Sequence, residues 1–131
     1  MKIALNGKDY QLKFGVRFIR ELDKKYFFGP EEIHFGTGVQ SAFQKLQSHD
    51  PVMLFDVLAA SLATQTTFTD GDFDAFFEAK NEQEINDLFA DLVKNLERQP
   101  MTAAKIKEYK ANIKKAANQM NPQVKPTETS N

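Results

Sequence analysis

The sequence has no cysteine among its 131 residues. This absence excludes disulfide bonds, thiolate nucleophiles and zinc sites built on sulfur. Excess positive charge is also missing, because 17 Lys and Arg stand against 18 Asp and Glu, which gives a formal net charge of -1. A chain without a global positive field cannot hold a nucleic-acid backbone well, so we expect no nucleic-acid partner.

Long apolar runs are missing too. No stretch approaches the roughly 18 apolar residues that a membrane-spanning helix requires, and the first seven residues lack the apolar core of a signal peptide. We therefore expect a soluble, cytoplasmic protein that has no membrane contact and forms one domain.

Side chains arranged for catalysis are scarce. The only histidines are His34 and His49, and neither has a nucleophile or further metal ligands at a useful spacing. Residues 70–74 (DGDFD) begin like a calcium loop, but Ala75 stands where the tight turn needs glycine and Asn81 where a glutamate should close the shell. We predict no catalytic residue, no cofactor and no metal site, and hence no enzyme.

Residues 2–13 predict an antiparallel β-hairpin. Apolar and polar residues alternate on both sides of Asn6-Gly7, a pair that tolerates the positive φ angles of a type I′ turn. A two-residue turn places Ile3 opposite Tyr10 on an apolar face. Because two strands alone are marginal in water, this face must lie on helices or on another chain.

Most of the remaining sequence has apolar residues at helical spacing. Asp50-Pro51 begins a segment that is apolar nearly all round, which is typical of a buried central helix. The expected helices cover 15–26, about 39–48, 51–63, a segment capped by Thr69, a segment from Asn81 to Pro100, and a last segment capped by Thr102.

The predicted fold class is α+β and mainly α-helical. The N-terminal hairpin packs on a bundle of about five to six helices in a single domain over residues 1–120. Residues 121–131 have no periodicity and are expected to form a disordered tail.

Charge is divided between two helical regions. Residues 70–98 hold nine acidic and three basic residues, whereas residues 105–115 hold five lysines and one glutamate. The two regions could attract one another within one chain or between copies, or each could simply face solvent. A homo-oligomer is therefore one expectation.

Phenylalanine is abundant, with 12 residues and no tryptophan. Most of them fall on helical faces, but Phe27, Phe28 and Phe35 fall in a predicted loop between residues 27 and 37. Gly36-Thr37-Gly38 at its end would let this loop enter the next helix. The three rings either pack within the chain or form part of a binding surface.

The last helix carries a narrow stripe of Ile106, Tyr109, Ile113 and Met120. Met and Tyr are adaptable contact residues, and neighbouring lysine stems can cover apolar surface while their ammonium groups stay in water. The stripe is a candidate surface for an apolar helical partner, or it packs on the chain's own core.

A family resemblance rests on residues 5–15 (LNGKDYQLKFG) running into residues 17–26 (RFIRELDKKY). This opening resembles the start of tail assembly chaperones of long-tailed, siphovirus-type phages and prophages of Gram-positive bacteria. The FGTG stretch at 35–38, the Asp50-Pro51 helix start, an acidic helical pair and a Lys-rich last helix follow in that family's order, over about residues 1–118.

The resemblance implies a non-catalytic protein of the host bacterial cytosol that is not part of the mature virion. Such a protein binds the tape-measure protein, keeps it soluble and helps recruit tail-tube subunits around it. A small cytosolic adaptor or regulatory module with another protein partner is the alternative.

Overall fold

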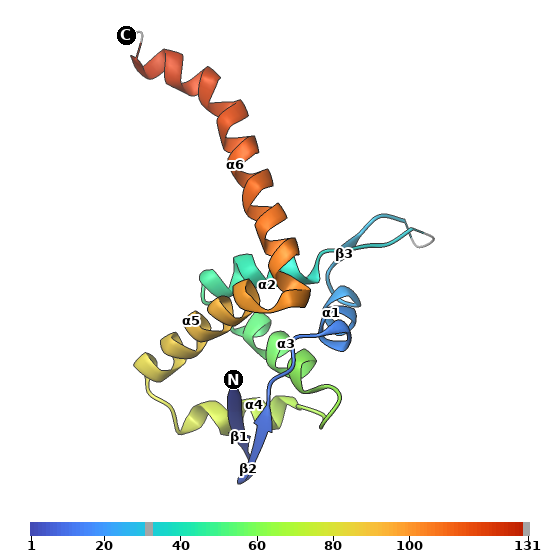
Figure 1. The fold of residues 1–131 in the computed structure, drawn as a ribbon. Helices are drawn as coiled ribbons and strands as arrows, with labels where there is room; N and C mark the ends of the chain where they lie inside the picture. The colour runs from blue at the N-terminus through green and yellow to red at the C-terminus, as the bar shows by residue number, and fades with distance from the viewer. Residues whose placement is uncertain (31–32, 130–131) are drawn as a thin grey trace.

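The computed structural model describes residues 1–30 and 33–129, and it describes side chains as far as residue 119. This part of the chain forms six helices and two small antiparallel sheets (Figure 1). The predicted α+β, mainly helical fold with an N-terminal hairpin is confirmed. In chain order the elements are β1 (Lys2–Leu5), β2 (Lys8–Gln11), α1 (Val16–Asp23), β3 (Phe27–Phe28), β4 (Phe35–Gly36), α2 (Gly38–Gln47), α3 (Pro51–Leu62), α4 (Asp70–Glu78), α5 (Glu82–Arg98) and α6 (Pro100–Thr129).

The β1–β2 hairpin has the predicted turn and register. Asn6 and Gly7 both have positive φ angles, of 52° and 77°, as a type I′ turn requires. Ile3 pairs with Tyr10. Ile3 and Leu5 are buried in the main core, so the apolar face of the hairpin packs on the chain's own helices.

Helix α3 lies at the centre of the fold, as its composition predicted. The Asp50 carboxylate accepts hydrogen bonds from the backbone N–H groups of Val52 and Met53, at 2.9 and 3.2 Å, and so caps the helix. Helices α1 and α2 pack against α3. The buried apolar side chains of α3 are Met53, Leu54, Val57, Leu58, Ala60 and Leu62.

Helices α4 and α5 each begin with a reciprocal capping box. The Asn81 side chain accepts from the Glu84 N–H at 2.9 Å, and the Glu84 carboxylate accepts from the Asn81 N–H at 3.1 Å. Thr69 and Asp72 make the same pair of hydrogen bonds at the start of α4. Residues 70–74 therefore serve as a helix start, the role that the poor match to a calcium loop favoured.

The predicted loop between residues 27 and 37 is in fact a second hairpin, and this corrects the sequence prediction. Phe27 pairs with Gly36 and Phe28 pairs with Phe35, so β3 and β4 form a short ribbon (Figure 1). Helix α1 ends at Asp23 rather than at residue 26. The sequence did not indicate the ribbon because each strand has only two residues, too few for an alternating pattern to show. The Gly-Pro pair indicated only that the helix ends.

Two glycines let the end of α1 approach the start of α2. The Asp23 carboxylate accepts a hydrogen bond from the Gly38 N–H at 2.9 Å, and the adjacent Thr37 side chain makes no capping bond. A Cβ built on Gly36 would lie 2.1 Å from Asp23 Oδ2, and one on Gly38 would lie 2.5 Å from Leu22 Cβ. The Gly-Thr-Gly segment therefore allows α2 to begin against α1.

Helix α6 differs from its prediction at both ends. Pro100 takes the first helical position, and Thr102 is buried inside the first turn, where its hydroxyl donates to the Leu96 carbonyl at 2.5 Å. The helical backbone continues to Thr129, past residue 120 where the domain was predicted to end, and leads away from the other helices (Figure 1). The side chains from residue 120 onward lie outside the described residues, and mobility of 121–131 in solution stays a prediction.

Among the helices of the described residues, none combines the length and the apolar character needed to cross a bilayer.

Candidate partner-binding surface

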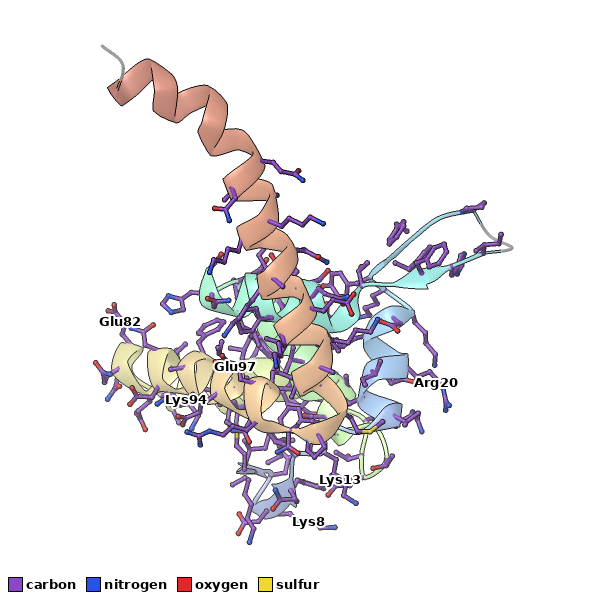
Figure 2. The ribbon with its side chains drawn as sticks, turned by 45° about the horizontal axis from the view of Figure 1, so that its top comes forward. Lys8, Lys13, Arg20, Glu82, Lys94 and Glu97 are labelled. Atoms are coloured by element: carbon purple, nitrogen blue, oxygen red, sulfur yellow. The ribbon has the colours of Figure 1, made fainter. Side chains whose placement is uncertain are left out.

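The β3–β4 ribbon carries aromatic side chains on both of its faces. Phe28 and Phe35 lie opposite each other, and their rings stack with centroids 5.1 Å apart. Neighbouring residues of a strand point to opposite faces, so Phe27 lies on the other side, where it stacks on His34 at 4.3 Å. The ribbon extends outward from the helices (Figures 1 and 2).

These rings are only partly protected from water. Phe27 is 44% exposed, Phe28 60% and Phe35 52%, and the nearby Ile33 is 57% exposed. The structure therefore brings together the three phenylalanines that the sequence singled out, and it adds Ile33 and His34. Sequence reasoning missed these two because it treated the segment as a loop without faces.

A shallow hollow of about 480 Å³ adjoins the Phe27–His34 face of the ribbon and extends along α1. Val16 in this hollow is itself 53% exposed, so apolar surface continues from the ribbon onto the body of the protein. The hollow is lined by Val16, Ile19, Arg20, Asp23, Lys24 and His34.

The root of the ribbon is tied to the central helix by a buried carboxylate. Asp56 of α3 is only 5% exposed. It accepts a hydrogen bond from the Tyr26 hydroxyl at 2.5 Å and pairs with the Lys25 ammonium at 2.7 Å. Burial, together with the hydrogen bond to Asp56, raises the pKa of Tyr26 above its usual range, so Tyr26 stays a donor.

Asp56 is a site residue that sequence reasoning missed. The signal was one acidic residue inside an otherwise apolar helix, since a buried carboxylate needs partners. Those partners are Lys25 and Tyr26, which directly precede Phe27. The arrangement fixes where the ribbon leaves the core.

The apolar stripe of α6 is divided between core and surface. Ile106 is 2% exposed and packs in the core, so this residue follows the alternative in which the stripe packs on the chain's own core. Tyr109 is half-buried, with its ring edge-on to Phe43 at 6.1 Å, whereas Ile113 is 54% exposed. The side chain of Met120 lies outside the described residues.

A second groove, of about 490 Å³, lies where α6 leaves α2 and α5. The Lys110 ammonium in its lining pairs with Glu97 at 2.5 Å and also lies 5.3 Å from the Phe43 ring centroid. Figure 2 places Glu97 on α5 alongside α6. The groove is lined by Phe43, Gln44, Gln47, Val93, Glu97, Tyr109, Lys110, Ile113 and Lys114.

The Lys110–Glu97 pair links the acidic and basic regions within one chain. Both side chains are exposed, so the pair itself contributes little stability. The other exposed lysines of 105–115 stay available to other charges.

The two histidines each lie against an aromatic ring. His34 stacks on Phe27, and His49 lies 4.9 Å from Phe89 between ring centroids. Over the described part of the chain, no group of three or more His, Asp or Glu side chains could hold a metal ion.

Comparison with known proteins adds one match. A family model described as phage tail assembly chaperone protein, TAC, matches residues 2–110. The match includes the whole β3–β4 ribbon and the first part of α6. No curated protein matches the chain, and neither does any solved structure.

Proposed function

We propose a function on the premise that the chain belongs to the phage tail assembly chaperone family, whose model covers most of it. In this proposal the protein binds the tape-measure protein, keeps it soluble and helps recruit tail-tube subunits during tail assembly. It acts without catalysis, in the host bacterial cytosol, and is not part of the mature virion.

The observation that carries the proposal is the exposed aromatic ribbon. A monomeric protein seldom leaves several large apolar side chains together in water unless a partner covers them. Aromatic residues supply large contact area and dominate the binding energy of many interfaces. Phe28 and Phe35 on one face and Phe27 on the other would let the ribbon cover apolar surface of an unfinished tail component.

The anchored root of the ribbon favours the same role. A contact surface that is already held in place loses less conformational entropy on binding. The hydrogen bond from Tyr26 to Asp56 and the ion pair from Lys25 to Asp56 hold the root of the ribbon against α3. The phenylalanine rings are thereby presented from a fixed base.

The groove beside α6 is the proposed second contact. Tyr109 and Ile113 offer apolar surface there, and Lys110 and Lys114 flank it with long stems. An amphipathic helix can lay its apolar face in such a groove. Long helical segments are what a tape-measure protein would present, so both surfaces suit the same partner.

Removing two rings from the ribbon should abolish most of the binding. We expect Phe28→Ser with Phe35→Ser to weaken binding to the tape-measure protein by at least about tenfold, because two anchor side chains are lost together. The thermal midpoint should stay close to that of the wild type, since both side chains are largely exposed. Affinity-tag co-purification and thermal melting measure the two effects.

Val52→Ser is the matched control, because Val52 is 66% exposed and lies on α3 rather than on the ribbon. It should leave binding unchanged. Ile113→Asp should weaken binding without lowering the thermal midpoint. Equal binding by the wild type and the double ribbon variant would show that the ribbon is not part of the interface.

Self-association stays part of the proposal. The exposed lysines of α6 could meet the acidic helices of another copy, since only the Lys110–Glu97 pair joins these regions within the chain as described. Salt would weaken such contacts, because exposed charges are screened beyond about 8 Å at physiological ionic strength.

A further inference from the structure

Strand β1 has one edge without a partner strand. Its sheet contains only β1 and β2. In an antiparallel pair the residues flanking a two-residue turn exchange hydrogen bonds, and bonding then alternates along the strand. Leu5 and Ile3 are therefore bonded to β2, whereas the N–H and C=O groups of Lys2 and Ala4 point away from it. Within the described residues, no backbone hydrogen bond from outside the hairpin reaches Lys2 or Ala4.

The free edge borders a groove of about 640 Å³ between the hairpin and helices α4 and α5. Asn6 Nδ2 contacts Asp72 Oδ1 at 3.5 Å at one end of β1, and Asn95 Nδ2 contacts Met1 Sδ at 3.3 Å at the other. These contacts join both ends of β1 to the helices. Labelled Lys8 and Glu82 locate the turn end of the hairpin and the start of α5 in Figure 2.

The groove combines an apolar floor with acidic side chains. Leu88 is buried there, and Ala75, Phe76 and Ala79 line the α4 side. Four carboxylates line the groove against only two lysine side chains, and one of these, Lys80, lies over the Phe76 ring at 4.3 Å. The acidic residues are Asp72, Glu84, Asp87 and Asp91, and the other lysine is Lys2.

We propose that this groove docks an extended, basic segment of a partner protein, which adds to β1 as a third strand. The backbone of the segment pairs with Lys2 and Ala4. Side chains alternate along a strand, so one set meets the apolar floor while the other, Lys or Arg, meets the carboxylates of α4 and α5. This site is separate from the ribbon and does not depend on the tape-measure proposal.

A second copy of the chain fits the edge less well. Pairing β1 with β1 across a two-fold axis would bring two acidic linings next to each other, and like charges side by side are unfavourable. A basic segment meets the same groove with complementary charge. The excess of carboxylates in the groove therefore favours a basic segment over a second copy of the chain.

The direct test uses a short fluorescent peptide in which lysine and valine alternate. Its affinity for the full chain, measured by fluorescence anisotropy, should exceed that of a glutamate–valine peptide by at least about tenfold. A peptide of the same composition with its lysines in one block should bind more weakly, because only alternation puts all charges on one face. Equal binding of the alternating and blocked peptides would overturn strand addition.

Two proline variants test the edge. Ala4→Pro removes an N–H that points into the groove while leaving the bonds to β2 in place. It should weaken binding of the alternating peptide about tenfold. Asp9→Pro is the matched control, since Asp9 lies opposite Ala4 and its N–H points to the other edge of the hairpin. Equal losses from both variants would contradict a site on β1.

A charge variant keeps the test decisive if a proline disturbs folding. Asp87→Asn with Asp91→Asn should reduce affinity for the lysine–valine peptide severalfold and flatten its salt dependence. Asp74→Asn with Glu78→Gln removes as much charge outside the groove and should have little effect. If the wild type forms a dimer and Ala4→Pro abolishes it, the occupant of the groove is a second copy of the chain. This result would overturn the proposal.

Discussion

Leu58→Ala is expected to lower the free energy of unfolding by about 2 to 5 kcal/mol. Leu58 is fully buried in α3, the helix that α1 and α2 pack against. The loss combines the transfer free energy of the removed methyl groups with the cost of a cavity that close packing cannot refill. Chemical denaturation followed by circular dichroism measures the change.

Val52→Ala on the same helix is the control for this experiment. Val52 is 66% exposed, so its truncation should change stability by no more than about 0.5 kcal/mol. Equal denaturation midpoints for Leu58→Ala and the wild type would show that α3 is not part of the core.

Gly38→Ala is the second variant with a large expected effect, a loss of about 1 to 3 kcal/mol of stability from overpacking. The new Cβ would lie 2.5 Å from Leu22 Cβ and 2.9 Å from the Leu22 carbonyl carbon, which cannot move without shifting α1. It would also crowd Asp23 Oδ1 at 2.8 Å, the atom that accepts from the Gly38 N–H. Thermal melting should show the loss.

Gly71→Ala provides the opposite case within the same chain. Its Cβ would meet only Thr69 Oγ1, at 3.8 Å, in the first turn of α4. Alanine should be neutral there, or stabilising by up to about 1 kcal/mol, because glycine is a poor helix former. If Gly38→Ala lowered stability no more than Gly71→Ala does, α1 and α2 would not be in the close contact described here.

The parts of the fold that follow from local chemistry were predictable from the sequence. Asn6-Gly7 fixes the first hairpin through its φ angles, and Asp50-Pro51 fixes the start of α3 through capping. Asn81 with Glu84 forms the capping box that its spacing indicated. In each case a few neighbouring residues determine the geometry.

The parts that depend on contacts between different elements were missed. Helix α1 ends at Asp23, and the Tyr26 hydroxyl bonds to Asp56, 30 residues further along the chain. Thr102 turns inward to the Leu96 carbonyl instead of capping α6. Neither partner can be identified from a local pattern, because the choice is made by packing.

The candidate surface was predictable only in part. An excess of phenylalanine outside the helical stripes singled out Phe27, Phe28 and Phe35, and the structure places all three on the β3–β4 ribbon. The helical period alone could not divide the α6 stripe, where Ile106 is buried and Ile113 is exposed, because that division depends on where α6 leaves α2 and α5.

The most direct test of the central claim is the solubility of the tape-measure protein when it is produced together with this chain. The proposed function predicts that the tape-measure protein stays in the soluble fraction with the wild-type chain. It should return to the pellet with the Phe28→Ser and Phe35→Ser double variant. A tape-measure protein that remains insoluble beside the folded wild-type chain would contradict the claim, and would leave an adaptor with another protein partner in its place.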